Sequence, residues 1–199
     1  MATDQSKFSA ATEHEENVKN NDIPEHPYPS VVERYFTPGY RTDLKGQKGE
    51  DFCILKHSNR VCVVTLAKGH PLLDVGKAPV TKVDFQVGEN TNRMNNKVTG
   101  KGKKGGQWLS EYSVLCRVRC ADSTEYTLYS CFKAKLVEVN EKLLERPQLL
   151  QEKPSTQGFI AIVLPKLGEC ESQMENLLSS SEYEDLIRTR TTEQNIPTG

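Results

Sequence analysis

Five positive side chains fall within twelve residues of the sequence and are the strongest candidates for chemistry. The cluster consists of Arg93, Lys97, Lys101, Lys103 and Lys104. No acidic residue interrupts it, four glycines between positions 100 and 106 predict a flexible loop, and Trp108 follows closely. Such lysines can simply be solvated, or they can contact an acidic protein surface or a phosphate backbone. Because lysine predominates and Trp108 is the one aromatic residue nearby, we expect such a contact to be mainly electrostatic, with little base-specific recognition.

Cysteine and histidine are the other residue types that could bind metal or act as nucleophiles. A structural zinc site needs four ligands, usually in closely spaced pairs. Cys116 and Cys120 lie on a predicted strand, where four residues at ~3.3 Å each separate them by about 13 Å. Cys53 and Cys62 lie in apolar strands, and the histidines nearest to them lie in turns. We therefore predict no metal ligand and no catalytic residue, and we interpret the cysteines as small buried side chains.

The charge distribution is uneven although the net charge is only −1. Residues 1–30 carry six acids and two bases, and residues 168–199 carry seven acids and two bases. Residues 31–167 therefore hold 14 acids and 22 bases, a net charge of +8 that suits an anionic partner. No apolar run approaches 18 residues and the N-terminus has no apolar core, so we predict neither a membrane span nor a secretory signal. Since no secretory signal is expected, we predict that the six cysteines are reduced thiols in the cytosol or nucleus.

Three regions are expected along the chain. Residues 1–29 are polar and acidic, with three prolines near their end, and predict a disordered tail. Residues 30–167 form the predicted β domain. Residues 168–199 form an acidic C-terminal segment with an amphipathic helix at about 181–190.

The β domain is expected to begin with a short helix. Ser30 and Glu33 have the spacing of a capping box and predict one or two helical turns over residues 31–36, ended by Pro38 and Gly39. Apolar side chains of this turn are expected to dock on the core, and residues 40–51 are expected to form a polar loop.

Short strands separated by turn residues fill the rest of the domain. Two hairpins are predicted, one from residues 52–55 and 61–66 and a clearer one from residues 112–120 and 125–132. Further predicted elements are strands over 80–87, 136–139 and 158–164, a short strand near 97–99 within a loop over 88–107, and a helical turn near 141–145. This pattern favours a small β-sandwich or flattened barrel.

Several segments resemble the glycine cleavage H-protein family. They are residues 129–130 (YS), 136–141 (LVEVNE), 146–150 (RPQLL), 158–160 (GFI) and 177–184 (LLSSSEYE). The family has Y-S-P-x-S-G, E-V-x-E-V-N-E, N-P-x-L-L and G-W-L at the first four spacings, and a closing L-L-x-x-x-x-Y-E helix. The resemblance implies a mainly β, lipoyl/biotinyl-like flattened barrel of two small sheets packed face to face, with the N-terminal helical turn and the C-terminal helix added.

The functional lysine of that family is missing. H-proteins hold a lipoyl group as an amide on a lysine at the tip of the hairpin that precedes Y-S-P, and this position falls on Ser123. No lysine occurs between Gly105 and Phe132, and only a primary amine can form that amide. We therefore predict that the chain binds no cofactor and is neither an acyl carrier nor an enzyme.

A second resemblance extends over almost the whole predicted domain. Residues 31–37 (VVERYFT), 53–60 (CILKHSNR), 96–101 (NKVTGK), 137–141 (VEVNE) and 149–156 (LLQEKPST) are similar to the Abitram family of actin-binding transcription modulators, also called Simiate. The resemblance implies binding of monomeric and filamentous actin, regulation of polymerisation and filopodia, modulation of transcription, and nuclear speckle components as further partners. It also implies a location in nuclear speckles and in the cytoplasm, including lamellipodia, growth cones and dendrites.

Two main hypotheses follow for function. The first is a non-enzymatic actin-binding protein whose lysine loop contacts the acidic surface of actin. The second is a nuclear protein that associates with the RNA or DNA backbone, motivated by the same basic body. A third, an enzyme or acyl carrier, has little support because the attachment lysine and any nucleophile–base pattern are missing.

Overall fold

The eleven strands form one large sheet and two smaller ones in a computed structural model that describes residues 28–194. The large sheet has the order β1-β2-β3-β11-β10-β7, with neighbouring strands antiparallel. Its strands are β1 (Phe36–Arg41), β2 (Phe52–His57), β3 (Cys62–Leu66), β7 (Trp108–Leu109), β10 (Ala134–Val139) and β11 (Ala161–Leu164). The second sheet joins β4 (Val80–Asp84), β8 (Val114–Cys120) and β9 (Glu125–Tyr129), and the third joins β5 (Gln86–Gly88) and β6 (Thr91–Asn92).

Five α-helices and three short 3-10 helices complete the described chain. The α-helices are α1 (Val31–Tyr35), α2 (Lys142–Glu145), α3 (Leu149–Glu152), α4 (Cys170–Glu175) and α5 (Ser180–Gln194). The 3-10 helices are η1 (Leu44–Gly46), η2 (Pro71–Leu73) and η3 (Arg93–Asn95). None of the helices between residues 28 and 194 combines the length and apolarity that a membrane crossing requires.

The main core lies between the six-stranded and the three-stranded sheets. Alternate side chains of each strand point into it, as the pleat of a β-strand requires. Members from the large sheet include Ile54, Val64, Leu136 and Val163, and members from the small sheet include Val83, Cys116, Val118 and Leu128. The predicted mainly β architecture with two facing sheets is therefore confirmed, and the two-stranded sheet is an addition.

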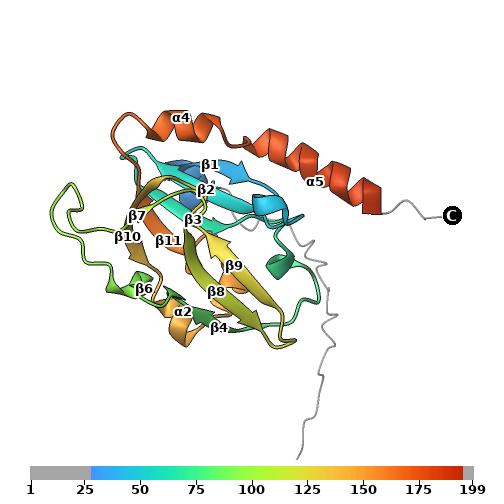
Figure 1. The fold of residues 1–199 in the computed structure, drawn as a ribbon. Coiled ribbons are helices and arrows are strands. Elements are labelled where there is room, and N and C mark those ends of the chain that lie inside the picture. The colour runs from blue at the N-terminus through green and yellow to red at the C-terminus, as the bar shows by residue number, and fades with distance from the viewer. Residues whose placement is uncertain (1–27, 195–199) are drawn as a thin grey trace, which may run out of the picture.

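The opposite face of the large sheet is covered by helices at β1, β2 and β3. Cys53, Leu55, Ala67 and Tyr183 form a second apolar cluster there, against which side chains from α1 and α5 pack. The ring of Tyr183 stacks on that of Tyr40 with centroids 4.2 Å apart. Figure 1 shows α4 and α5 lying over β1 and β2. Because both faces of β2 are covered, its first four residues are all buried.

A buried carboxylate fixes the far part of α5 to the domain. Asp51 has no exposed surface, and its Oδ2 accepts hydrogen bonds from the Tyr183 hydroxyl at 3.1 Å and from Arg190 Nη1 at 2.6 Å. Arg190 Nη2 also contacts Asp43 Oδ2 at 2.8 Å. The backbone amide of Gly69 donates to the Tyr183 hydroxyl at 3.0 Å, and a Cβ at position 69 would lie 2.5 Å from Ile187 Cδ1. The helix therefore packs tightly on the turn after β3.

The N-terminal helix and the strand after it correct one part of the sequence interpretation. The Ser30–Glu33 capping box is present, but the helix ends at Tyr35 and the chain continues through Pro38 and Gly39 as β1. A proline is tolerated here because β1 is an edge strand. Tyr40 directs its N–H and C=O away from β2, and by the two-residue period of a strand the missing N–H of Pro38 falls on that same side. The predicted polar loop of residues 40–51 thus begins later, after Arg41.

The outer side of β1 is paired with the segment that joins α4 to α5. Tyr40 and Leu178 exchange two backbone hydrogen bonds, each 2.9 Å long. A Cβ at Gly39 would lie 2.9 Å from the side chains of both Met174 and Leu177. The absence of a side chain at position 39 therefore lets the C-terminal segment approach β1 closely.

Both predicted hairpins are present, as β2–β3 and β8–β9, and the remaining predictions differ in detail. The C-terminal helix is longer than predicted and runs from Ser180 to Gln194, while β7, α3 and α4 were not predicted from the sequence. The short strand expected near 97–99 is reduced to a single bridge between Thr99 and Lys104. In α1, Val31 and Tyr35 are largely exposed, so only Val32 and the following Phe36 contact the second cluster. Residues 1–27 of the predicted disordered tail lie outside the residues that the structure describes.

Candidate interaction surface

The H-protein resemblance implies that a lipoyl-carrying relative would present its lysine at the tip of the β8–β9 hairpin. Ser123 occupies this tip with a left-handed φ of 65° and an exposed side chain. Its amide donates to the Cys120 carbonyl at 3.0 Å, which closes a tight turn. The tip therefore presents the hydroxyl group of Ser123.

A lysine from another segment is fixed against the same turn. Lys77 Nζ lies 3.0 Å from Asp122 Oδ2 and 2.9 Å from Thr124 Oγ1, and it sits 5.3 Å from the centroid of the Tyr126 ring. Hydrogen bonds from the Thr124 hydroxyl and amide, together with Lys77, lower the pKa of Asp122 to about 2. The Lys77 amine points onto the hairpin and does not project from it, so it does not replace the missing attachment lysine.

The cysteines are buried, as predicted, and all six are free thiols. Burial raises the pKa of Cys53 to about 12 and raises the pKa values of Cys116 and Cys131 as well. Thiols with such pKa values stay protonated near neutral pH and are poor nucleophiles. Within residues 28–194, no three His, Cys, Asp or Glu side chains are grouped so that they could hold a metal ion.

The basic loop between β6 and β7 projects from the body of the domain (Figure 1). Lys97, Lys101 and Lys104 are exposed and Lys103 is half-buried. The bridge between Thr99 and Lys104 narrows the loop into a finger, and Gly105, with φ of 83°, brings its backbone against the Lys97 carbonyl. In the part of the chain that the structure describes, none of these four lysines forms an ion pair. Their charges are therefore available to a partner.

Arg93 is separated from the four lysines by its environment. Its guanidinium is buried at the base of the loop, where Nε donates to the Val114 carbonyl at 2.9 Å and Nη1 donates to Gln107 Oε1 at 2.6 Å. Burial lowers its pKa. These bonds attach η3 to β8 and to the end of the loop, which gives Arg93 a structural task in supporting the finger.

Strand pairing connects Trp108 to two lysines that the sequence interpretation did not include, Lys135 and Lys166. Trp108 on β7 is 52% exposed and lies directly opposite Lys135 on β10. The Nζ atoms of Lys135 and Lys166 each lie 5.3 Å from the centroid of its ring. Lys135 Nζ also donates to the Gly102 carbonyl at 3.3 Å, which connects the indole to the loop. Only the register of β7, β10 and β11 brings these residues together, and a scan for local motifs cannot detect it.

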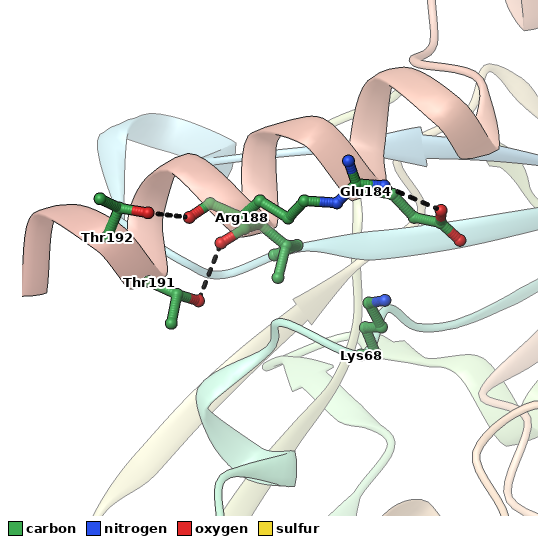
Figure 2. A pocket seen from close by; sticks show the side chains of 6 residues that line it. Lys68, Glu184, Arg188, Thr191 and Thr192 are labelled. Carbon is green, nitrogen blue, oxygen red and sulfur yellow. Dashed lines mark hydrogen bonds and ion pairs between the residues drawn. The ribbon is translucent and has the colours of Figure 1, made fainter. Parts of the chain in front are cut away.

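The open groove beside α5 has a different character (Figure 2). It lies between Lys68 and the helix, and it is lined further by Glu184, Ile187, Arg188, Thr191 and Thr192. Arg188 pairs with Asp185 at 3.2 Å and with Glu184 at 3.9 Å, while the two threonine hydroxyls donate to carbonyls one turn earlier in the helix. Most polar groups of this groove are thus engaged within α5, and the basic surface around the loop is the better candidate site.

Comparison with known proteins connects the chain to two families. The glycine cleavage H-protein family model matches residues 103–190, which include the β8–β9 hairpin and the C-terminal helices. Together with the two facing sheets, this match confirms the predicted lipoyl-like fold. A crystal structure of a glycine cleavage system H protein from Mycobacterium marinum is 18% identical, with a TM-score of 0.45, over 68% of this chain and 89% of that one.

Much more similar relatives carry the name Protein Abitram. The Danio rerio protein is 49% identical over 169 residues, which cover 85% of this chain and 94% of the relative. The Homo sapiens protein is 50% identical over 162 residues, covering 81% and 89%. The Dictyostelium discoideum protein is 33% identical over 160 residues, covering 79% and 87%.

Proposed function

The chain belongs to the Abitram family, and from this premise we propose that it is a non-enzymatic actin-binding protein built on a lipoyl-like scaffold. The family resemblance implies binding of both monomeric and filamentous actin. The observation that carries the proposal is the projecting finger with four lysines that form no ion pairs within the described residues. A partner with an acidic surface complements such a finger in charge, and long-range attraction accelerates its association.

The proposal includes the cellular role that the family resemblance implies. In the cytoplasm, binding to actin regulates its polymerisation and the behaviour of filopodia, in lamellipodia, growth cones and dendrites. In the nucleus, the protein occupies speckles, contacts speckle components there and modulates transcription. The supporting feature is again the basic body, because it suits anionic partners in both compartments.

The proposal excludes a carrier role. Support comes from the hairpin tip, where Ser123 stands and where Lys77 is engaged with Asp122 and Thr124. Mass spectrometry of the intact protein, produced in cells that lipoylate an H-protein in parallel, tests this point. We expect no lipoyl adduct, and an adduct on any lysine would refute the exclusion.

Co-sedimentation with filamentous actin at several salt concentrations tests the main proposal. In the test variant, Lys101, Lys103 and Lys104 are changed to Glu. If each reversal costs about 1 kcal/mol at low salt, the three together weaken binding roughly 100-fold. The wild-type affinity should fall steeply as salt screens the lysines.

A control variant with the same change in net charge separates local from global electrostatics. Lys48, Lys142 and Lys153 are exposed, lie elsewhere on the domain and can be changed to Glu in the same way. We expect this control to bind actin within a few-fold of wild type. Equal binding by the loop variant and the control would remove the loop from the contact, and failure of the wild type to sediment with actin would refute the proposed function.

A further inference from the structure

The outer face of the six-stranded sheet is covered by helices at one end and open at the other. Ala134 and Leu136 of β10 point into the main core, so Lys135 between them points to the outer face. Trp108, paired with Lys135, shares that face, because directly opposite residues of antiparallel strands point the same way. The indole is 52% exposed, so this end of the outer face is open to solvent at Trp108.

Positive charges follow one another along this open end. The ammonium groups of Lys166 and Lys135 each lie over the Trp108 ring, 5.3 Å from its centroid, and Lys135 Nζ also donates to the Gly102 carbonyl of the loop. Gly102 lies within the loop that carries lysines 97, 101, 103 and 104. Among the described ion pairs, one acidic residue contacts these lysines: Glu169, whose Oε1 lies 3.7 Å from Lys166 Nζ. Both side chains of this pair are about half exposed. Such an exposed pair is weak, so it does not prevent Lys166 from binding another anion.

We infer that this stripe, formed by Trp108, Lys135, Lys166 and the loop lysines 97, 101, 103 and 104, binds single-stranded nucleic acid. One base stacks on the exposed indole, and the lysine ammonium groups that it displaces from the ring bind the neighbouring phosphates. A line of cations that contains an exposed aromatic ring is the usual composition of such sites. Because every cation is a lysine, with no arginine fork to read base edges, binding does not depend on sequence.

An acidic peptide is the alternative ligand, and it fits the stripe less well. Carboxylates would bind the lysines equally well, but they would make no contact with the exposed part of the Trp108 ring. Bases of every type have a face that can stack on an indole. The inference does not depend on actin binding, although both ligands would contact the loop.

The chain has a single tryptophan, so its fluorescence reports on this site alone. We expect titration with a twelve-nucleotide oligo(dT) or oligo(rU) in low salt to quench Trp108 emission. The logarithm of the binding constant should fall linearly with the logarithm of salt concentration, with a slope of about −0.7 for each phosphate neutralised. Changing Lys135 or Lys166 to Gln should make that slope shallower by about 0.7 each.

Fluorescence anisotropy of a dye-labelled oligonucleotide extends the test to variants without tryptophan. Loss of one stacked base costs 1–3 kcal/mol, so Trp108→Leu should weaken binding about 5- to 150-fold. Trp108→Phe keeps a stacking ring and should weaken it less. Tyr35→Leu is the matched control, because Tyr35 is 56% exposed on α1 and lies outside the stripe. This control should bind like wild type.

Several results would contradict binding of single-stranded nucleic acid at Trp108. Wild-type affinity in Trp108→Leu, or oligonucleotide binding without quenching, would show that no base stacks there. If poly-glutamate bound as tightly as the oligonucleotide and quenched Trp108 equally, the stripe would be a site for acidic protein segments. Absence of binding at low salt would refute the site altogether.

Discussion

Replacing Arg190 by Ala should destabilise the domain far more than its place near the C-terminal end of a surface helix suggests. The Arg190 side chain is only 13% exposed and contacts Asp51, which is fully buried. Without Arg190, the Asp51 carboxylate keeps the Tyr183 hydroxyl at 3.1 Å and the Asp43 amide at 3.1 Å, but it loses the one cation with which it pairs within residues 28–194. A buried charge without its counter-ion is costly because nothing replaces its hydration.

The expected loss of unfolding free energy in Arg190→Ala depends on how deeply Arg190 and Asp51 are buried. Removing one partner of a buried ion pair typically costs 3–5 kcal/mol. We take the lower end, about 3 kcal/mol, because the space left by Arg190 opens toward the surface and admits water to Asp51. The second contact of Arg190, with the half-exposed Asp43, adds well under 1 kcal/mol.

Urea denaturation at pH 7, followed by Trp108 fluorescence and by circular dichroism, measures the free energy of unfolding. Arg188→Ala is the matched control, since Arg188 lies on the same helix, is 74% exposed and pairs only with surface acids. We expect a loss below about 0.5 kcal/mol for the control. If the two variants differed by less than 0.5 kcal/mol, the Asp51–Arg190 pair would not hold α5 as we describe. A fall in the circular dichroism signal of Arg190→Ala before global unfolding would locate the loss in α5.

Two further predictions concern buried positions elsewhere in the domain. Burial lowers the pKa of His70 to about 3, whereas in the unfolded chain its pKa is near 6.5. The unfolded chain therefore binds a proton more readily at acidic pH. The contribution of His70 to the free energy of unfolding is fully present above pH 6.5 and falls by about 4 kcal/mol as the pH drops toward 3. His70→Asn keeps a side-chain acceptor for the Leu72 amide but does not titrate. The difference in unfolding free energy between this variant and wild type should therefore change by up to ~1.4 kcal/mol per pH unit. If the two curves of unfolding free energy against pH ran parallel, the lowered pKa of His70 would be contradicted. Gly158→Ala should cost at least about 3 kcal/mol in denaturant titrations, because its Cβ would lie 1.9 Å from the Leu149 carbonyl oxygen. Gly102→Ala, whose Cβ meets no atom within 4 Å, should stay within about 0.5 kcal/mol of wild type; equal losses in the two variants would disprove the crowding.

The elements that sequence reasoning predicted well are those defined by neighbouring residues. The hairpins β2–β3 and β8–β9 each consist of two apolar runs joined by a short polar turn, so local turn chemistry and the alternation of side chains suffice. The capping box at Ser30 is likewise complete within four residues. The hairpin tip at Ser123 could be located by spacing for the same reason.

The parts that could not be predicted depend on contacts between distant segments. A two-residue strand such as β7 has no pattern of its own and exists because β10 pairs with it. From the sequence alone, Pro38 predicts the end of a helix. It can lie within β1 because β1 is an edge strand, and only the strand order reveals this. Charge counting groups Arg93 with the lysines, yet its side chain points inward to Val114 and Gln107. Trp108 gains its cations only through strand register.

The pairing of Tyr40 with Leu178 has a consequence for solubility. A bare edge strand is a template for another chain, and such templating leads to aggregation. On β1 this template is blocked by the α4–α5 connection and by Pro38, while at the opposite margin β7 offers only two residues. The C-terminal segment thus prevents other chains from pairing with β1. A chain shortened before Met174 would leave the outer side of β1 free to pair with further copies in a cross-β assembly.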